Sequence, residues 1–279
     1  MQQRIVVLFL MMYAVSAASG AAGNACAQWN GPPTVLAPLP QPMQLDDRLI
    51  EASTKGEVAA IRSLVKQGAT VNAKGPDGMA ALVVAVGNGQ ADAAKVLLEL
   101  GADVNLESKD GMTALIAAAI TGQTGVISTL IDKGARVNAK NSDGATPLIL
   151  AVMMGQIEAA GLLLEKGAEV NAKDNLGSTA LHGATIYGSA EMTKLLIEKG
   201  ANVNAKDNRG GTALLFGVAI ANTDIVRALV EKGAEVNAVT EGGVTVLGRA
   251  QEDMTELGDK ARDARQAEIV AILKKAGAK

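Results

Sequence analysis

Short apolar segments alternate with polar connectors along most of the chain, and residues 174–206 show one full cycle of this pattern. Thr179 stands just before the first apolar segment, where its hydroxyl is suited to cap the free N–H groups of a helix. Leu181 and Ala184 follow three residues apart, the spacing of side chains on one helix face. Residues 187–189 (Tyr-Gly-Ser) then interrupt the pattern, so a short helix is predicted before them.

A second apolar segment in the same cycle predicts a second helix. It carries Met192, Leu195 and Leu196, and we expect Leu195 to lie in the core. The segment ends at Gly200, a residue type that tolerates the left-handed backbone found at helix ends. Residues 203–208 then form a polar connector, predicted to be a tight turn. One such helical hairpin cannot bury its own apolar face, so successive hairpins must stack into a continuous core.

The cycle repeats with a constant period. The sequence Gly-Ala-x-Val-Asn begins at six equally spaced positions: Gly68, Gly101, Gly134, Gly167, Gly200 and Gly233. A leucine keeps the same period at Leu82, Leu115, Leu148, Leu181, Leu214 and Leu247. A threonine precedes the last five of these leucines by two residues. Two sets of markers in one register indicate a repeat protein.

These repeats resemble the ankyrin repeat, a unit of about 33 residues that begins with Thr-Pro-Leu-His-x-Ala. Residues 146–148 keep three letters of that motif, and residues 179–184 keep four, including His182, the only histidine of the chain. Elsewhere Ala replaces the Pro, and apolar residues replace the His. The resemblance implies an all-α, ankyrin-like solenoid of about seven helix-turn-helix repeats with short hairpin loops. It also implies a structural role for His182, which would tie the turn of its repeat by hydrogen bonds.

The repeats are expected at about 45–74, 75–107, 108–140, 141–173, 174–206, 207–239 and 240–279. The first lacks the Thr-x-Leu opening and begins with charged residues, as a capping repeat should. The last is longer than the others, because Gly277 follows Gly233 by more than one period. The extra residues fall near 251–262, between the two predicted helices. They form either a longer hairpin that overhangs the stack and touches the partner, or a solvated excursion.

Residues 1–27 have the order of a secretory signal peptide. Arg4 is followed by the apolar run 5–15, and Ala25-Cys26-Ala27 resembles a signal-peptidase site. The run is short for a membrane span. We therefore expect cleavage after Ala27, and no membrane association of the mature chain. The alternatives are an uncleaved anchor, which would make a membrane-tethered adaptor, and lipidation of Cys26, although Gly23 stands where a lipoprotein signal usually has Leu.

Residues 28–44 hold five of the seven prolines and are expected to form an extended linker between the signal peptide and the solenoid at 45–279. A proline-motif ligand is the alternative interpretation of this stretch. The compartment most consistent with an acidic, cysteine-free mature chain behind such a signal is the periplasm of a Gram-negative bacterium.

Composition argues against several other functions. The formal charge is −3 and only 2% of residues are aromatic, so we expect no nucleic-acid partner. With one His, and no Cys once the signal is removed, a zinc cluster or a Cys–His dyad is not expected. No P-loop or dinucleotide fingerprint occurs. We therefore predict no enzyme activity, no cofactor, no metal and no small-molecule substrate; an enzyme built around His182 is the remote alternative.

Partners of ankyrin-like stacks usually lie along the concave face, formed by connector tips and exposed positions of the first helix. Tyr187 is the expected main anchor, because Tyr is enriched at binding hot spots. The resemblance maps this surface onto residues just before the repeat Thr and at the end of the first helix, namely Met79, Met112, Ile120, Met153, Met154, Ile186, Tyr187 and Ile220. An exposed apolar strip there would mark an interaction site; packing between repeats is the other interpretation. The connector lysines at 74, 140, 173 and 206 are either a solvated edge or a contact for an acidic partner.

The sequence therefore predicts a protein–protein interaction module acting after export. It fits a scaffold or accessory factor, and it equally fits an inhibitor or immunity protein that blocks the active site of a toxin or enzyme.

Overall fold

The computed structural model describes residues 43–252 and 260–279. The chain divides into the units Met1–Pro42 and Met43–Lys279, and only the second contains described residues. Its described residues form 14 α-helices, with isolated bridges in place of strands. The expected all-α, ankyrin-like solenoid is therefore confirmed. The predicted signal peptide, with Cys26, and all but the end of the predicted linker lie outside the described residues.

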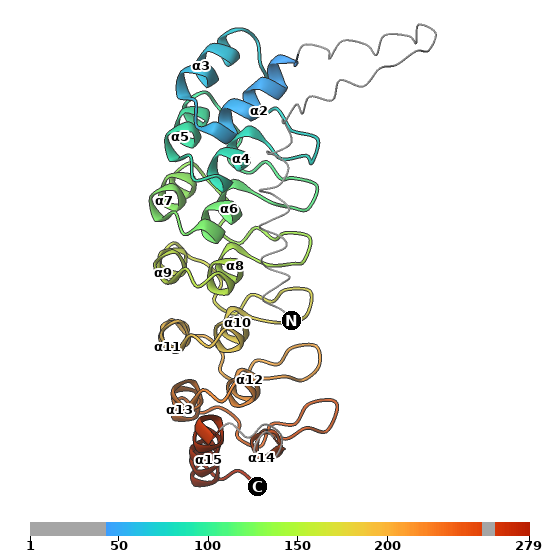
Figure 1. Cartoon of the computed structure of the whole chain (residues 1–279), viewed down its shortest axis with the longest axis vertical. Helices are drawn as coiled ribbons and strands as arrows, with labels where there is room; N and C mark the ends of the chain where they lie inside the picture. The colour runs from blue at the N-terminus through green and yellow to red at the C-terminus, as the bar shows by residue number, and fades with distance from the viewer. Residues whose placement is uncertain (1–42, 253–259) are drawn as a thin grey trace, which may run out of the picture. The chain divides into compact units, whose positions relative to one another are not determined.

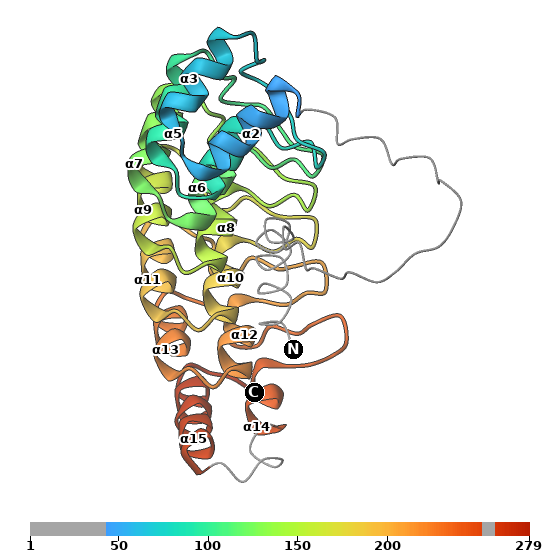
Figure 2. The ribbon, with the colours of Figure 1, turned by 45° about the horizontal axis from the view of Figure 1, so that its top comes forward.

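The helices form two columns, with one helix of each repeat in each column (Figures 1 and 2). The first helices are α2 (Leu45–Lys55), α4 (Ala81–Gly87), α6 (Ala114–Thr121), α8 (Pro147–Met153), α10 (Ala180–Ile186), α12 (Ala213–Ala219) and α14 (Val246–Glu252). The second helices are α3 (Val58–Lys66), α5 (Ala91–Glu99), α7 (Thr124–Asp132), α9 (Ile157–Glu165), α11 (Ala190–Glu198), α13 (Thr223–Glu231) and α15 (Lys260–Lys275). Each first helix packs on the first helix of the next repeat, which gives the stack its continuous core.

Threonine side chains start the first helices, as the sequence pattern predicts. Thr113, Thr146 and Thr212 each accept a hydrogen bond from the backbone N–H three residues later. The helix α8 also has Pro147 in its first turn, where the missing N–H of proline has no cost. These caps fix where α6, α8 and α12 begin.

In the six repeats before the last, the turn between the two helices passes through a left-handed residue. That residue is glycine in five repeats (Gly56, Gly89, Gly122, Gly155 and Gly188), with φ between 70° and 75°. In the repeat 207–239 it is Ala221, whose φ is 53°. Ala221 is the one non-glycine residue with positive φ in the described part of the chain, and its side chain is buried. A Cβ atom makes this conformation unfavourable, so the turn at Ala221 is strained.

The repeated asparagine joins each repeat to the next. The side-chain oxygen of Asn204 accepts the backbone N–H of Glu235 at 2.7 Å, and its amide nitrogen donates to the carbonyl of Gly233 at 3.1 Å. Asn105, Asn138 and Asn171 make the same pair of bonds one repeat apart. This asparagine ladder explains why Gly-Ala-x-Val-Asn recurs without a slip.

The periodic leucines fill the core, and Leu82, Leu115, Leu148, Leu181 and Leu214 are all at most 2% exposed. In the second helix α11, Met192 and Leu196 are fully buried. Leu195 is only partly buried and packs at the margin of the core. The prediction that Leu195 is a core residue is therefore wrong, because the inward face of α11 is set by the spacing of Met192 and Leu196, four residues apart.

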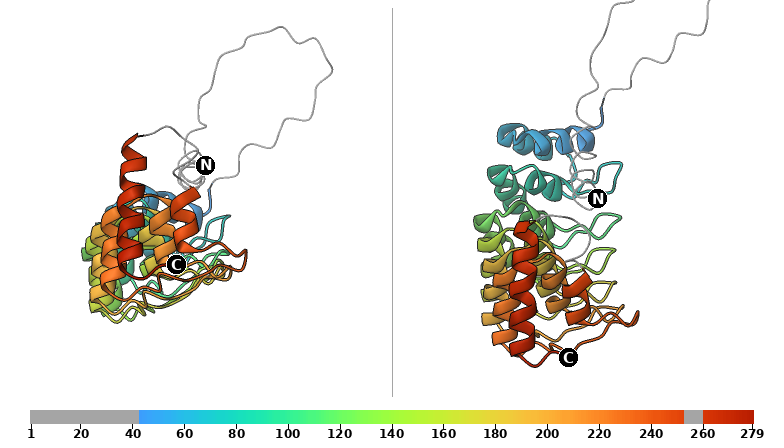
Figure 3. Two further views of the ribbon diagram at one scale, coloured as in Figure 1. Left: turned by 90° about the horizontal axis from the view of Figure 1, so that it is seen from below. Right: turned by 60° about the horizontal axis from the view of Figure 1, so that its bottom comes forward.

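The last repeat accommodates its extra residues by lengthening its second helix. The helix α15 has 16 residues, whereas α13 has nine, and Figure 3 shows it extending past its neighbours. Residues 260–262 belong to this helix, so the predicted insertion ends earlier than expected. The guanidinium of Arg262 donates to the carbonyl of Ala219, at the end of α12. The ladder still closes here, since Asn237 bonds Gly277 and Lys279.

The connectors between repeats form hairpins, here called fingers, at residues 74–80, 107–113, 140–146, 173–179, 206–212 and 239–245. Backbone bonds join successive fingers, for example from the N–H of Asn175 to the carbonyl of Asp143 at 2.9 Å. Lysine side chains also link successive fingers, since the ammonium groups of Lys74, Lys140 and Lys173 each donate to a backbone carbonyl one repeat later in the chain. These three lysines therefore stabilise the stacking of the fingers.

Candidate partner-binding surface

The first helices of the five middle repeats carry no charged residue. Their sequences are ALVVAVG (α4), ALIAAAIT (α6), PLILAVM (α8), ALHGATI (α10) and ALLFGVA (α12). The second helices beside them, α5, α7, α9, α11 and α13, each carry at least one acidic residue. A helix whose outer face meets water normally has polar residues on that face. The face of the first helices is therefore unusual and calls for an explanation.

The exposed side of these helices forms one apolar strip. The helix-face strip is defined as two rows of equivalent positions, one turn apart along the helix. The first row is Val84, Ala117, Leu150, Gly183 and Phe216, and the second is Gly87, Ile120, Met153, Ile186 and Ala219. All but Ala117 are partly or fully exposed. An apolar surface that runs over five repeats is larger than the scattered exposed leucines of ordinary proteins.

Three of the predicted binding residues are clearly exposed. Ile186, Tyr187 and Ile220 expose 37%, 44% and 39% of their surface. Ile120 and Met154 are half-buried. Ile186 belongs to the helix-face strip, and Tyr187 and Ile220 follow the last residues of α10 and α12.

Met79, Met112 and Met153 are half-buried and pack partly against the core. Met153 lies across the helix interface, where its Cγ is 3.7 Å from the place a Cβ on Gly183 would occupy. The absence of a side chain at Gly183 therefore makes room for Met153 on the face of the next repeat. These methionines contribute to packing between repeats and also to the apolar surface.

Tyr187 and Ile220 occupy equivalent positions in consecutive repeats. Ile220 is thus the counterpart of Tyr187, and Ala219 is the counterpart of Ile186. The Cδ1 atom of Ile220 also lies 3.5 Å from the place a Cβ on Gly188 would occupy, directly beside Tyr187. Ile186, Tyr187 and Ile220 are thus three exposed apolar side chains at the ends of α10 and α12, here called the cluster, and they extend the strip there.

The sequence interpretation missed Leu176, which is 70% exposed at the tip of its finger. The signal was present in the repeat register, because the equivalent positions in the three preceding repeats are Asp77, Asp110 and Asp143. A leucine in place of an aspartate on a solvated turn is not explained by turn formation. The repeat 174–206 therefore has exposed apolar side chains at both its fingertip and the end of its first helix.

The sequence interpretation also missed Val84, Leu150 and Phe216, which lie one helical turn before the predicted helix-end positions. Tyr187 is therefore not the only aromatic residue on this surface. Phe216 is half-buried and meets the ring of His182 edge-on, with centroids 5.8 Å apart. Moving three residues back from the register of Ile120, Met153 and Ile186, and applying that register to every repeat, would have found all three.

His182 is fully buried and has the structural role that the resemblance implied. Its Nδ1 accepts the backbone N–H of Thr179 at 3.0 Å, and its Nε2 lies 3.0 Å from the carbonyl oxygen of Ala205 and 3.3 Å from that of Gly211. A carbonyl can only accept, so the proton is on Nε2. Burial lowers the pKa of His182, because the charged ring would lose its hydration. This side chain fastens the finger of the next repeat and is not available for acid–base chemistry at the surface.

The fingertips carry the charge that the strip lacks. Asp77, Asp110 and Asp143 are exposed, and none forms an ion pair among the described residues. Asp77 accepts the backbone N–H of Met79 at 2.9 Å, a bond local to its turn. Farther along the same row come Leu176 and Arg209. The row is thus acidic in its first half, apolar in the middle and basic after it.

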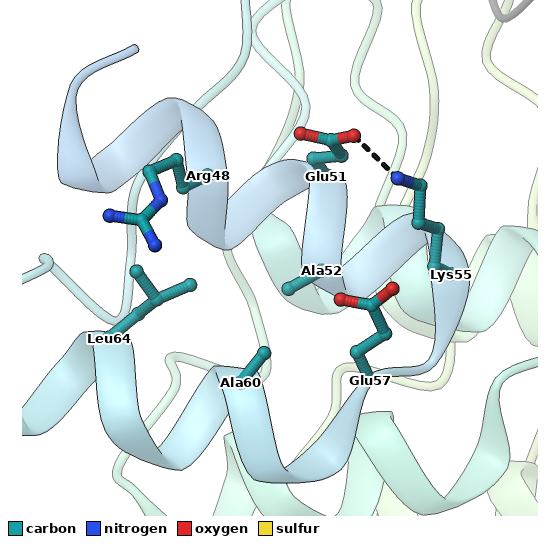
Figure 4. Close-up of a pocket in the computed structure, with 7 residues that line it drawn as sticks. All are labelled: Arg48, Glu51, Ala52, Lys55, Glu57, Ala60 and Leu64. Carbon is teal, nitrogen blue, oxygen red and sulfur yellow. Dashed lines mark hydrogen bonds and ion pairs between the residues drawn. The ribbon is translucent and has the colours of Figure 1, made fainter. Parts of the chain in front are cut away.

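Two shallow hollows lie away from the strip. One, of about 140 Å³, lies between α2 and α3 at the first repeat, where Glu51 pairs with Lys55 (Figure 4). The pairing lowers the pKa of Glu51 and raises that of Lys55. The other, of about 500 Å³, lies between α5 and α7 and is lined by small residues such as Gly89, Gly122 and Gly125. Neither brings together groups suited to catalysis.

In the described ranges, no helix has both the length and the apolar character needed to cross a membrane. The same residues contain no cluster of three His, Cys, Asp or Glu side chains that could hold a metal ion.

Comparison with known proteins gives one family. The family model described as Ankyrin repeats (3 copies) matches residues 26–108, 101–174 and 170–240. A search of curated proteins returned no match.

Proposed function

Since the chain belongs to the ankyrin-repeat family, whose repeats are generally protein–protein interaction modules, we propose that it binds another protein along the helix-face strip. The observation that carries this proposal is the absence of any charged residue from the five helices α4, α6, α8, α10 and α12, although their outer faces meet solvent. Covering such a face removes apolar surface from water, which favours association. Ankyrin repeats are typically non-enzymatic, in line with a role in binding.

The cluster of Ile186, Tyr187 and Ile220 is the proposed centre of the contact. These side chains are among the few large apolar groups exposed in the described residues. Tyr is enriched at hot spots because it joins a large apolar ring to a hydroxyl. The half-buried predicted residues of the three preceding repeats, Met79, Met112, Ile120, Met153 and Met154, extend the proposed contact, and the methionines make it adaptable because methionine repacks readily.

Photo-crosslinking tests the proposal directly. A photoreactive amino acid at position 186 should trap a protein from an extract of the source cell. The same amino acid at position 199, exposed at the end of α11, is the control. A specific adduct at position 186 alone supports the strip as the interface. Equal adducts at both positions, or none at 186, would refute it. Assaying the trapped protein with and without the chain then separates an inhibitor or immunity role from a scaffold role.

We also propose that binding takes place after export, in the periplasm. The support is the order of charged, apolar and small residues in 1–27, together with the proline-rich stretch that follows. The mass of the protein recovered from the periplasm should correspond to a chain that begins at Gln28. A retained Met1 would contradict export by cleavage, and a lipid on Cys26 would indicate a membrane-anchored form.

A further inference from the structure

We infer that the partner presents an amphipathic α-helix with basic flanks, which lies along the helix-face strip; this inference rests on the proposed function and names the form of its partner. Three features of the described residues support it: the strip lacks polar side chains, its repeats have a regular spacing, and the fingertips carry aspartates that form no ion pair.

The lack of polar side chains disfavours an extended peptide on the strip. The strip residues, such as Val84, Leu150 and Ile186, offer no side-chain donor or acceptor, and the backbone beneath them is bonded within its own helices. A strand laid there would lose the water bonded to its N–H and C=O groups without replacing it, which is costly. A helix satisfies its backbone internally and brings only side chains to the surface.

The spacing of the strip also matches a helix. Packed helices lie roughly 8–10 Å apart, and a helix rises about 1.5 Å per residue. A helix along the stack therefore advances about five to seven residues for each repeat of the protein, and the upper end of this range is close to one heptad. Its apolar side chains would meet equivalent positions in successive repeats, such as Ile120, Met153 and Ile186.

The fingertip residues determine which charge the partner helix should carry beside its apolar face. The fingers project from the column of first helices, on the side away from the column of second helices (Figure 1). At their tips, the carboxylates of Asp110 and Asp143 accept no hydrogen bond and form no ion pair within the described part of the chain. The ammonium groups of Lys74, Lys109 and Lys140, in the same fingers, are bonded to backbone carbonyls of adjacent fingers. The carboxylates of Asp110 and Asp143 thus keep all their acceptor sites for a partner, although the nearby lysines retain their positive charge, and Lys or Arg side chains complement these carboxylates.

The row of fingertip residues also gives the partner helix a direction. The basic side chains of the partner face the repeats that carry Asp77, Asp110 and Asp143. Its largest apolar side chains face the repeat 174–206, where Leu176 and Tyr187 are exposed. In the next repeat the equivalent fingertip residue is Arg209, whose positive charge disfavours basic side chains at that end of the partner helix.

Designed peptides test the inference on the purified full chain. The first is a labelled 24-residue peptide (a length of about 36 Å as a helix) of Leu and Lys, with Leu spaced three and four residues apart. The second has the same composition with Leu and Lys alternating, the pattern of a strand. The third is the first with Glu in place of Lys. We expect the helical Leu/Lys peptide to bind more tightly than either of the others by about tenfold or more.

Matched variants assign that binding to the strip and the fingertips. Replacing Ile120→Gln and Ile186→Gln together should weaken the helical peptide about tenfold or more. Replacing Asp110→Asn and Asp143→Asn should weaken it about three- to tenfold at low salt and less at high salt. Glu158→Gln with Glu191→Gln removes the same charge from α9 and α11 and should leave affinity within about twofold. Circular dichroism confirms that each variant is folded.

Four outcomes would overturn the inference: equal binding of the alternating peptide, equal weakening by the fingertip and control pairs, no effect of the strip pair, or no binding of the helical peptide at millimolar concentration. If position 186 still crosslinks a protein in the cell extract, the proposed function stands and only the helical form of the partner is wrong.

Discussion

The backbone N–H of Thr179 donates to Nδ1 of His182 at 3.0 Å, so the first turn of α10 is closed by a ring nitrogen that must be unprotonated. Since burial lowers the pKa of His182 in the folded protein, folding favours the neutral ring. The stability that this provides is fully present above the unfolded pKa of about 6.5 and is lost as the pH falls through the lower folded value.

We therefore expect the free energy of unfolding to fall between pH 7.5 and pH 5 by more in the natural chain than in His182→Ile, which has the residue of the equivalent position 149. Urea denaturation at several pH values measures the difference between the two slopes. Carboxylates titrate in both proteins and cancel in this comparison. Parallel pH profiles would show that His182 is not the group responsible.

Ala221→Gly should stabilise the protein by about 0.5–1 kcal/mol, because glycine removes the cost of a left-handed Cβ and returns only part of it as unfolded-chain entropy. The matched reverse change, Gly155→Ala, should be destabilising, as φ is 71° there and nothing lies near the added Cβ. Thermal or urea unfolding of both variants checks the signs. A loss of stability in Ala221→Gly would mean that packing of the buried methyl outweighs the strain.

Asn204→Ala should cost about 1–3 kcal/mol, since it leaves the N–H of Glu235 and the carbonyl of Gly233 without their ladder partner. Asn202→Ala, two residues away, is a suitable control because its amide oxygen bonds only the nearby N–H of Asn204. Chemical denaturation should show the larger loss for Asn204. Similar losses would indicate a local effect of the turn and no contribution from the link between repeats.

Tyr187→Ala should weaken partner binding by about 2 kcal/mol or more, roughly thirtyfold, if Tyr187 is a hot spot. It should change stability little, because the residue is 44% exposed. Leu196→Ala should do the reverse and destabilise by about 2–5 kcal/mol, as the side chain is fully buried. Calorimetry of binding and urea unfolding separate the two effects. Equal destabilisation by both changes would place Tyr187 in the core.

The constant period of the repeat was enough to predict the fold, because Leu181, Thr179 and the Gly-Ala-x-Val-Asn sequence each perform one local task in every repeat. Helix ends were also predictable from Thr179 and Gly200. The face of each helix was harder to assign, since Leu195 and Leu196 are both leucines and only the packing of neighbouring repeats decides which is buried.

A similar reason explains why only part of the partner-binding surface was predicted. Positions at helix ends, such as Tyr187, can be read from the repeat register, but partial exposure in mid-helix, as at Leu150 and Phe216, depends on the side chains around them. Leu176 could have been found by comparing fingertips. The path of 260–262 within α15 could not, because nothing in the other repeats has an equivalent.

The ladder bonds of Asn237 span 40 and 42 residues, whereas those of Asn204 span 29 and 31. The same clamp is therefore closed around a longer stretch of chain. Since loop-closure entropy rises only slowly with length, a terminal hairpin held at its base can grow at small energetic cost. The last repeat is thus a site where insertions are tolerated, and where evolution or protein engineering can add a segment while the register of the other repeats is preserved.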